Sequence, residues 1–333
     1  MKVLCYGMQD AEKEIFNKVN ENYNFELEFT SELLNNENVN NVKGFDALIL
    51  FVNCDASAKN LEKIKELGVK YIVTRTAGYN HIDLKVAKSL NYIIGRVPQY
   101  SPFSIASLAF SGGLSLLRKS SYMYSKTNIG NFKIDDNMFA KEIKNCTIGI
   151  LGTGKIGFET AKMWKALQTN IIAYDPYPNE EAKNILTYTI FEEVINKSDL
   201  ISLHMPYFKG ENDEIINESV INNMKSQAIL VNTARSELVS LSAIVKSIKS
   251  NHLGGYVTDV FPFESEIINN DFSNNFPENL KLIQELISLY PKTLVSPHVA
   301  YFTDEAVKNM AETSFKNLDQ LIKTGICDNA IEI

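Results

Sequence analysis

The chain has 333 residues, of which 45% are hydrophobic and 22% charged, and this length and balance predict a soluble globular protein of two domains. A formal net charge of −7 argues against binding to nucleic acid or an anionic membrane, and no apolar run approaches the ~20 residues that span a bilayer. The first residues are typical of a strand rather than a signal peptide, and the four cysteines form no Cys-x-x-Cys pair, so we expect a cytoplasmic protein with reduced thiols and no metal site.

The first hundred residues alternate short apolar runs, typical of strands, with helical patterns such as Leu61–Leu67. The predicted strands are Val3–Tyr6, Phe25–Phe29, Ala47–Phe51, Tyr71–Val73 and Tyr92–Ile94. This alternation predicts a parallel sheet covered by helices. The two prolines of Val97–Pro102 then stop both helix and sheet before a long apolar helical pattern from Ser104 to Leu117, which indicates a crossing into a second domain.

A dinucleotide-binding pattern follows, in which an apolar run from Thr147 to Leu151 leads directly into Gly152-x-Gly154-x-x-Gly157. The three glycines permit a tight turn, close approach of a pyrophosphate and close packing of the next helix, whose amino end favours phosphate. A second run ends at Asp175, where a carboxylate accepts the ribose hydroxyls and repels the extra phosphate of NADP. No arginine follows in residues 176–179, so NAD is the predicted cofactor; an ordinary turn with a turn acid before proline is the alternative.

Further predicted strands complete a doubly wound sheet, at Leu200–Leu203, Ala228–Val231, Gly255–Val260 and Thr293–Val295. Three polar groups follow these strands. Arg235 offers a planar fork of donors suited to a carboxylate, and His298 can protonate an oxygen near neutral pH if Glu264 orients it. Taken singly, each has a structural interpretation, as a surface ion-pair member, a turn histidine and a solvated loop acid. His204 is expected to line the dinucleotide cleft in a structural role.

Eight ordered stretches carry a resemblance to a known family: Arg75–Asp83, Val97–Pro102, Gly152–Gly157, Tyr174–Pro178, Ser202–Pro206, Val231–Arg235, Asp259–Glu264 and Ser296–His298. With them the chain resembles, from first strand to last helix, the D-isomer-specific 2-hydroxyacid dehydrogenases, particularly the D-lactate and D-2-hydroxyisocaproate branch. The resemblance implies an α/β protein of two Rossmann-like, doubly wound parallel-sheet domains. A flavodoxin-like substrate-binding domain of residues 1–101 and 299–333 would be discontinuous, with an NAD-binding domain of residues 102–298 inserted in it.

The same resemblance implies that the helix Thr303–Lys323 packs on the N-terminal domain, through an apolar face formed by Ala306, Met310, Phe315, Leu318, Leu321 and Ile322. It also implies hinge closure over the substrate and a homodimer formed through the NAD domains.

By this resemblance His298 is the general acid of 2-oxo acid reduction, Glu264 is its partner, and Arg235 binds the carboxylate and polarises the C2 carbonyl. The backbone N–H groups of Ala77 and Gly78 would hold the carboxylate, with Tyr100 and Tyr301 bordering the substrate. From the residues alone, the turn at 76–78 is equally an anion nest or an ordinary strand-to-helix turn. The implied cofactor contacts are Gly152, Gly154, Lys155, Ile156, Gly157, Asp175, Met205, Pro206, Asn212, Thr233, Ala234, Arg235 and Asp259.

The expected reaction is the reduction of pyruvate by NADH to D-lactate. The alternatives are a D-2-hydroxyisocaproate-type enzyme for larger 2-oxo acids and, from another class, a non-catalytic NAD-sensing protein like the corepressor relatives. A small side chain is favoured because bulky Phe51 and Tyr301, with Val52 and Cys54, are expected around it. The chain departs from common family residues at Ser107-Leu108, Ser236 and Pro262, none of which removes a proposed catalytic group.

Overall fold

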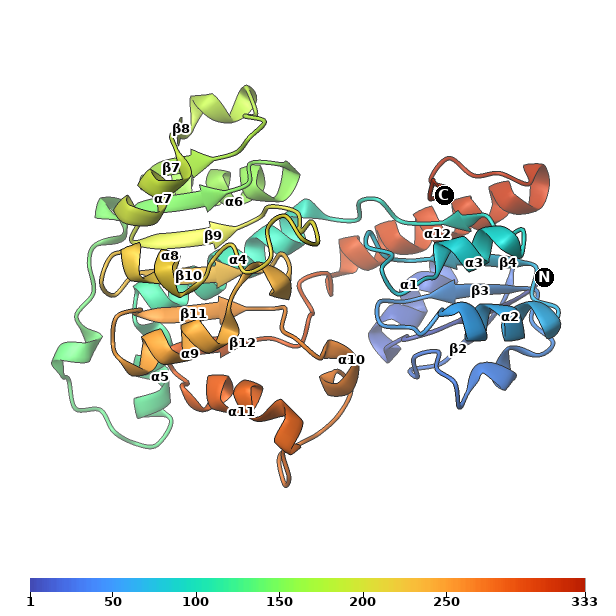
Figure 1. The fold of residues 1–333 in the computed structure, drawn as a ribbon, viewed down its shortest axis with the longest axis horizontal. Coiled ribbons are helices and arrows are strands. Elements are labelled where there is room, and N and C mark those ends of the chain that lie inside the picture. The colour runs from blue at the N-terminus through green and yellow to red at the C-terminus, as the bar shows by residue number, and fades with distance from the viewer. Residues whose placement is uncertain (333) are drawn as a thin grey trace. The chain divides into compact units, whose positions relative to one another are not determined.

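The computed structural model describes residues 1–332, and the chain divides into two compact units. Unit 1 comprises Met1–Ser101 together with the residues from Tyr301 onward, and unit 2 is Pro102–Ala300. In each unit a parallel sheet lies between layers of helices (Figure 1). The predicted α/β class with two doubly wound parallel sheets is confirmed.

The sheet of unit 1 has five parallel strands in the order β2-β1-β3-β4-β5, the flavodoxin-like arrangement. The strands are β1 Lys2–Cys5, β2 Glu26–Phe29, β3 Ala47–Leu50, β4 Tyr71–Thr74 and β5 Ile94–Gly95. All four residues of β3 are buried, as expected for a central strand covered on both faces. The strand order reverses between β1 and β3, where open sheets of this kind bind ligands at the carboxyl ends of the strands.

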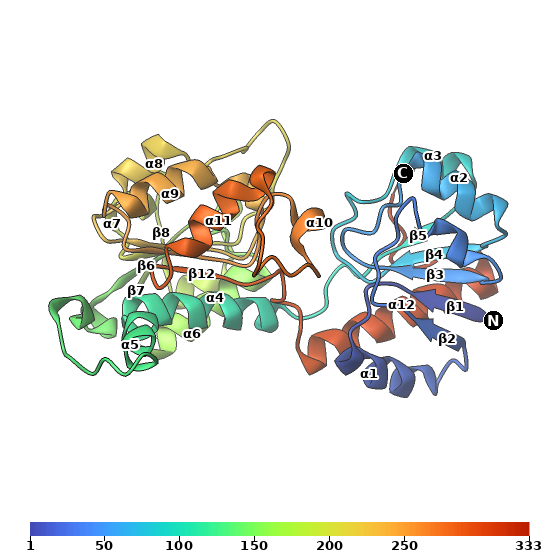
Figure 2. The ribbon, with the colours of Figure 1, turned by 90° about the horizontal axis from the view of Figure 1, so that it is seen from below.

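Helices cover both faces of this sheet, with α2 and α3 on one side and α1 and α12 on the other (Figure 2). Their bounds are α1 Asp10–Asn20, α2 Ala58–Glu66, α3 Leu84–Ser89 and α12 Asp304–Thr324, with a 3₁₀ turn η1 at Val39–Val42. The rings of Phe16 in α1 and Phe315 in α12 meet edge to face, 5.6 Å apart. The predicted apolar face of α12 is buried except at Ile322, which is 38% exposed, so that residue was wrongly assigned to it.

The sheet of unit 2 has seven parallel strands in the order β12-β11-β10-β9-β6-β7-β8. The strands are β6 Thr147–Leu151, β7 Asn170–Tyr174, β8 Thr187–Tyr188, β9 Leu200–Leu203, β10 Ile229–Asn232, β11 Gly255–Thr258 and β12 Thr293–Val295. The first six strands from the β8 edge follow the dinucleotide-binding order 3-2-1-4-5-6, and the order reverses between β6 and β9. A ligand crevice is therefore expected at the carboxyl ends of these two strands.

In unit 2, α4, α5 and α6 lie on one side of the sheet, and α7, α8, α9 and α11 lie on the other (Figure 2). The helices are α4 Pro102–Leu117, α5 Ser120–Thr127, α6 Lys155–Ala166, α7 Phe191–Lys197, α8 Glu218–Asn223, α9 Leu241–Lys249, α10 Glu264–Ile267 and α11 Lys281–Ser288. The 3₁₀ turns are η2 Asp136–Met138, η3 Ile143–Asn145, η4 Glu181–Asn184, η5 Ser236–Leu238 and η6 Glu278–Leu280. Gly113 allows helix α4 to pack closely on the sheet, since a Cβ at this position would lie 2.7 Å from the side chain of Leu200. Trp164 of α6 is fully buried next to Gly113.

Several predicted strand ends differ from the structure by one residue, and the predicted start of β5 and end of β11 differ by two. Strand β5 begins at Ile94, because Tyr92 is instead buried beside the strand, with its hydroxyl donating to the carbonyl of Val69 at 2.8 Å. Strand β11 ends at Thr258, because the hydroxyl of Thr258 bonds to both the N–H and the carbonyl of Val260 and turns the chain there.

Candidate active site

The glycine turn between β6 and α6 has the shape that dinucleotide binding requires. Gly152 has φ +92°, and a Cβ there would lie 2.7 Å from the backbone at His204 and Met205. A Cβ on Gly157 would lie 1.9 Å from the carbonyl oxygen of Gly152, so these two glycines are fixed by the protein's own packing. By contrast, a Cβ on Gly154 would meet no atom within 4 Å. The space above Gly154, at the amino end of α6, is therefore open to a phosphate group.

Asp175 directly follows β7 and is held against the same turn. Its Oδ2 atom accepts hydrogen bonds from the backbone N–H and the hydroxyl of Thr153, at 2.6 and 2.9 Å. The hydroxyl of Tyr188 in turn donates to the Thr153 hydroxyl at 2.7 Å, and the N–H of Tyr177 donates to Asp175 Oδ1 at 2.8 Å. A carboxylate has about four acceptor positions, and three are used here, so this one keeps capacity for a ribose hydroxyl. Sequence reasoning missed Thr153 and Tyr188, since the glycine pattern leaves the residue at position 153 unspecified and Tyr188 lies outside the pattern.

The other predicted cofactor residues follow β9 and β10, at the carboxyl edge of the sheet. Thr233 has a buried hydroxyl oxygen that no group within residues 1–332 hydrogen-bonds, which leaves it available to a ligand. Asn212 binds its own loop, donating to the carbonyl of Pro206 at 2.8 Å and accepting from the N–H of Phe208 at 2.7 Å. The open space at Gly154 and the orphan hydroxyl of Thr233 both fit a bound dinucleotide.

His298 and Glu264 meet in unit 2, although 34 positions separate them. The His298 Nδ1 atom lies 2.7 Å from Oε2 of Glu264, and their side chains are 24% and 14% exposed. Burial disfavours the charged imidazole, but the hydrogen bond and charge of Glu264, together with the charge of Asp259, outweigh it and raise the pKa of His298. The pair therefore holds a proton more tightly than an isolated histidine does.

The backbone around His298 is fixed by Asp259. Its carboxylate accepts the hydroxyl of Ser296 at 2.6 Å and the N–H groups of Val299 and Ala300 at 2.9 and 2.8 Å. These bonds hold His298 at φ +55°, a left-handed conformation that a non-glycine residue seldom adopts. Burial raises the pKa of Asp259, opposed by these hydrogen bonds. Asp259 was predicted as a cofactor contact, but both of its carboxylate oxygens accept hydrogen bonds from the segment around His298.

Arg235 is exposed between β10 and η5. Its Nη1 atom donates to the carbonyl of Ala234 at 2.7 Å, and Asn232 Nδ2 donates to the Arg235 carbonyl at 2.9 Å. Among residues 1–332 no carboxylate pairs with this guanidinium, yet its charge lowers the pKa of His298 and so acts on it. An unpaired guanidinium beside a histidine–carboxylate pair is suited to binding an anion whose oxygen the histidine protonates.

His204 differs sharply from His298. Its Nε2 atom lies 2.8 Å from the hydroxyl of Ser202, and burial lowers the pKa of His204 to about 3. The ring is therefore neutral at physiological pH, and it packs beneath the glycine turn rather than carrying a proton.

The predicted substrate residues Phe51, Tyr100 and Tyr301 contact other residues of unit 1. The rings of Phe51 and Tyr301 pack 5.2 Å apart, and Phe51 also stacks on the guanidinium of Arg75 at 3.9 Å. Tyr100 accepts a hydrogen bond through its carbonyl from Asn309. Cys54, expected to line the side-chain pocket, is fully buried in the core of the unit, so its thiol is unavailable to a substrate.

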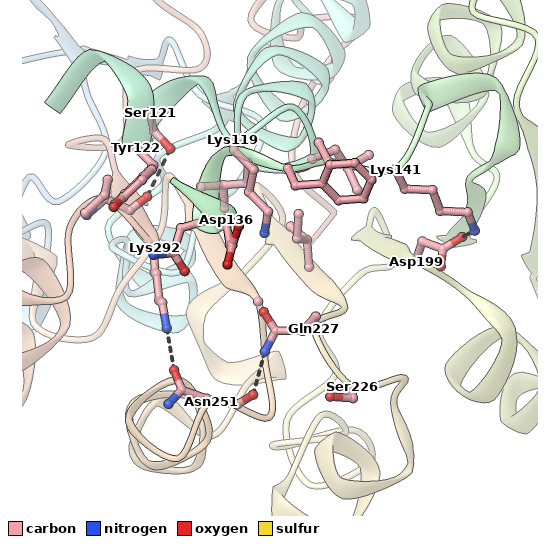
Figure 3. Close-up of a pocket in the computed structure, with 18 residues that line it drawn as sticks. Lys119, Ser121, Tyr122, Asp136, Lys141, Asp199, Ser226, Gln227, Asn251 and Lys292 are labelled. Carbon is pink, nitrogen blue, oxygen red and sulfur yellow. Dashed lines mark hydrogen bonds and ion pairs between the residues drawn. The ribbon is translucent and has the colours of Figure 1, made fainter. Parts of the chain in front are cut away.

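A cavity of about 830 Å³ in unit 2 is separate from all these residues (Figure 3). It lies at the amino ends of the strands, where Asp199 precedes β9, Gln227 precedes β10 and Lys292 precedes β12. Two of its lysines are bound within the unit, Lys141 to Asp199 at 2.9 Å and Lys292 to Asn251 at 2.6 Å. None of the predicted site residues lines it.

The comparison with known proteins decides the family. The family model described as "D-isomer specific 2-hydroxyacid dehydrogenase, NAD binding domain" matches residues 110–300, more than half of the chain. The chain belongs to the D-isomer specific 2-hydroxyacid dehydrogenase family. It is therefore an NAD-dependent oxidoreductase, and the predicted family, enzyme class and cofactor are confirmed.

Full-length relatives support this assignment. The chain is 31% identical over 330 residues to an aromatic 2-oxoacid reductase of Clostridium sporogenes, with 99% of this chain and 98% of that protein covered. It is 33% identical over 336 residues to the D-lactate dehydrogenase of Escherichia coli, covering 99% and 100%. The apo structure of the E. coli enzyme superposes with a TM-score of 0.89 at 32% identity over 100% of both chains. A D-2-hydroxyisocaproate dehydrogenase structure gives 0.87 at 32% identity over 99% of both chains.

These relatives are enzymes, and nothing in the matches indicates a corepressor. None of the helices described is long and apolar enough to cross a membrane. Within residues 1–332, no group of three or more His, Cys, Asp or Glu side chains is placed to hold a metal ion.

Proposed function

We propose that this enzyme reduces a small 2-oxo acid with NADH, and that pyruvate, giving D-lactate, is its preferred substrate. The observation that carries the proposal is the His298–Glu264 pair beside the unpaired guanidinium of Arg235. A proton donor with a raised pKa and an anion-binding group are what reduction of a 2-oxo carboxylate demands of the protein.

In this mechanism His298 is the general acid. Because Nδ1 is held by Glu264, the Nε2 atom of the imidazolium is the one that gives its proton to the C2 oxygen of the substrate. NADH, when bound, supplies the hydride that C2 accepts. The carbonyl thereby becomes the hydroxyl of a D-2-hydroxy acid, His298 becomes neutral, and a proton from solvent restores it. Glu264 keeps the ring oriented and stabilises its charged form.

Arg235 would bind the substrate carboxylate and polarise its C2 carbonyl. A bidentate guanidinium gives both orientation and charge stabilisation as negative charge develops on the oxygen. Its lack of a carboxylate partner among the described residues supports this role, since a guanidinium already paired would have to break that bond first.

We propose that NAD is held at the carboxyl edge of the unit 2 sheet. The turn at Gly152, Gly154 and Gly157 and the first residues of α6, Lys155 and Ile156, would hold the pyrophosphate, and Asp175 the adenosine ribose. Met205, Pro206, Asn212, Thr233 and Ala234 would line the rest of the site, with Arg235 beside the nicotinamide. Asp259 would act mainly by fixing the segment that carries His298.

Residues of unit 1 would recognise the substrate. We propose that the N–H groups of Ala77 and Gly78 bind its carboxylate and that Tyr100 and Tyr301 border it. The packed rings of Phe51 and Tyr301 favour a methyl group over a larger side chain. Branched and aromatic 2-oxo acids are the second candidate class, because relatives named for an aromatic 2-oxoacid reductase and a D-2-hydroxyisocaproate dehydrogenase match about as well.

The test is NADH consumption with pyruvate, 2-oxoisocaproate, phenylpyruvate, 2-oxoglutarate and oxaloacetate in parallel, with the product's chirality determined. Pyruvate should give the highest kcat/KM and D-lactate the only product enantiomer. His298→Asn should reduce turnover by about 10²–10⁴-fold while NADH binding, followed by fluorescence, stays near wild type. Near-normal turnover in that variant would refute the assignment of the acid.

We also propose a cytoplasmic homodimer formed through the NAD-binding unit. Unit 2 exposes apolar side chains on the segment after α5, where Ile129, Phe132, Ile134 and Phe139 are 78%, 77%, 84% and 87% exposed. Such a row of exposed apolar groups is expected at a protein interface. The cytoplasmic assignment is supported by the four cysteines, all of them free thiols.

A further inference from the structure

Two backbone N–H groups of unit 1 are left free on the turn after β4. Among the described residues, neither the N–H of Ala77 nor that of Gly78 has a hydrogen-bond partner within the chain. Both residues are only half-buried. Unpaired amides on a turn form an anion-binding nest only if their directions are fixed, since a mobile turn has to order itself on binding.

The carbonyl on the other side of each of these peptide groups is held. The carbonyl of Thr76, which shares a peptide plane with the N–H of Ala77, accepts from the N–H of Val97 at 3.1 Å. The carbonyl of Ala77, which shares a plane with the N–H of Gly78, accepts from Nη1 of Arg96 at 2.9 Å. In a planar trans peptide the N–H points opposite to the C=O. Both free amides therefore point away from the Arg96–Val97 strand end.

Arg96 is itself held before any ligand arrives. Its backbone N–H donates to the carbonyl of Asn329 at 3.0 Å, and its carbonyl accepts from Nδ2 of the buried Asn317 at 2.7 Å. Its guanidinium lies 5.3 Å from the ring centre of Tyr79, on the same turn. The arginine is thus anchored by the C-terminal segment and α12, and it contacts the turn on the side opposite to the two free N–H groups.

The Ala77–Gly78 peptide differs from the next one in the charge of the group that donates to its carbonyl. The carbonyl of Gly78 accepts a hydrogen bond from the neutral hydroxyl of Thr76 at 2.6 Å. The carbonyl of Ala77 accepts instead from the charged guanidinium of Arg96. A charged donor on a carbonyl polarises the whole peptide group and strengthens the hydrogen bond that its N–H gives.

We propose that Arg96 is a positioning residue for substrate binding, which fixes and polarises the Ala77–Gly78 peptide so that the N–H of Gly78 binds the substrate carboxylate. This inference rests on the proposed function and goes beyond it, because Arg96 acts through the peptide and not by touching the substrate. The positive charge of Arg96 also offsets part of the negative charge that the turn receives.

The first experiment separates substrate binding from chemistry. Arg96→Met should raise KM for pyruvate about tenfold or more while kcat falls less than about threefold, and the Kd of NADH should not change. Arg96→Lys, which keeps the charge and one donor, should recover part of the loss. Arg118→Met is the matched control, because it removes the same charge from an exposed position after α4. A KM no higher in Arg96→Met than in Arg118→Met would overturn the proposal, as would an equal loss of kcat and kcat/KM.

The second experiment observes the amide directly and does not require turnover. With ¹⁵N-glycine labelling and Gly78→Ala to assign the signal, oxamate added to the NADH-bound protein should shift the Gly78 resonance in wild type and much less in Arg96→Met. Oxamate binding that leaves the Gly78 signal unmoved would refute the role of Arg96. If no 2-oxo acid is reduced but oxamate still shifts Gly78 in an Arg96-dependent way, the proposed function fails and the anion-binding inference stands.

Discussion

The Nδ1 atom of His298 lies 2.7 Å from Oε2 of Glu264, and this contact is built by the ends of two neighbouring strands. Strands β11 and β12 pair in parallel, with Thr258 opposite Val295, so the chain leaves both at the same edge of the sheet. Each segment then has a left-handed backbone conformation at or beside the paired residue: Phe263, directly before Glu264, has φ +64°, and His298 itself has φ +55°. The pair is thus a product of sheet register and two strained residues, not of sequence proximity.

The raised pKa of His298 predicts how reduction depends on pH. The reaction needs the protonated imidazole, so kcat/KM for the 2-oxo acid should be constant below this pKa and fall as pH rises through it. Glu264→Gln removes the charge that favours the protonated ring. The falling limb should therefore move to lower pH in that variant, measured as NADH consumption between about pH 5 and 9. An unshifted limb would mean that another group limits the rate.

Gly154 and Gly157 predict opposite consequences for the same substitution. Gly154→Ala places a Cβ in open space on a backbone of φ −61°, so the melting temperature should stay close to wild type while NADH binds about tenfold more weakly or worse. Gly157→Ala forces a Cβ against the carbonyl of Gly152 and should cost about 1–3 kcal/mol of unfolding free energy or more. Calorimetry and NADH fluorescence titration measure the two effects. Normal NADH affinity in Gly154→Ala would place the pyrophosphate elsewhere.

Asp175 should determine the choice between the two nicotinamide cofactors. Asp175→Ser removes the carboxylate that would repel a 2′-phosphate, and the NADPH to NADH ratio of kcat/KM should rise about tenfold or more. Tyr188→Phe is the control: it removes the remote hydroxyl that donates to Thr153 but leaves the carboxylate, so the ratio should change far less. Equal ratios in wild type and Asp175→Ser would separate this residue from cofactor choice.

The exposed apolar row of unit 2 predicts the oligomeric state. Light scattering after gel filtration should give about twice the chain mass of 37.5 kDa for wild type. A double variant, Phe132→Glu with Ile134→Glu, should elute as a monomer, because a charge buried in an interface without a partner is strongly unfavourable. Phe208→Glu, an exposed aromatic of unit 2 outside that row, serves as control. A dimer that survives the double substitution would assign the interface to another surface.

Much of the fold was predictable because its strands are short, its central strands are buried, and turns flank them. Leu200–Leu203 and Thr293–Val295 were predicted with both ends correct, as short runs that are mostly apolar or β-branched. Helix α5 was missed, since its sequence has little apolar periodicity and only Ser121 in it is buried. Tyr92 was wrongly placed in a strand because a buried aromatic ring at the end of an apolar run has the same pattern whether or not its backbone joins the sheet.

The candidate site divides in the same way. The glycine turn and Asp175 carry a local pattern, and the structure gives them the geometry that this pattern requires. Contacts between residues that are distant in the sequence leave no such local pattern. The bonds from Asp259 to residues 40 and 41 positions away, and the bond from Arg96 to Ala77, depend on which strands become neighbours. No spacing rule in a single sequence reveals them.

Arg235, Glu264 and His298 all belong to unit 2, whereas Phe51, Ala77, Gly78 and Tyr301 belong to unit 1. In the proposed function, residues of unit 1 select the side chain of the acid, so substitutions there would change selectivity and leave His298, Glu264 and Arg235 in place. Relatives named for lactate and for aromatic 2-oxo acids, at 33% and 31% identity, fit such a division of labour. The proposal therefore predicts that substitutions which change the substrate preference of this chain lie in unit 1.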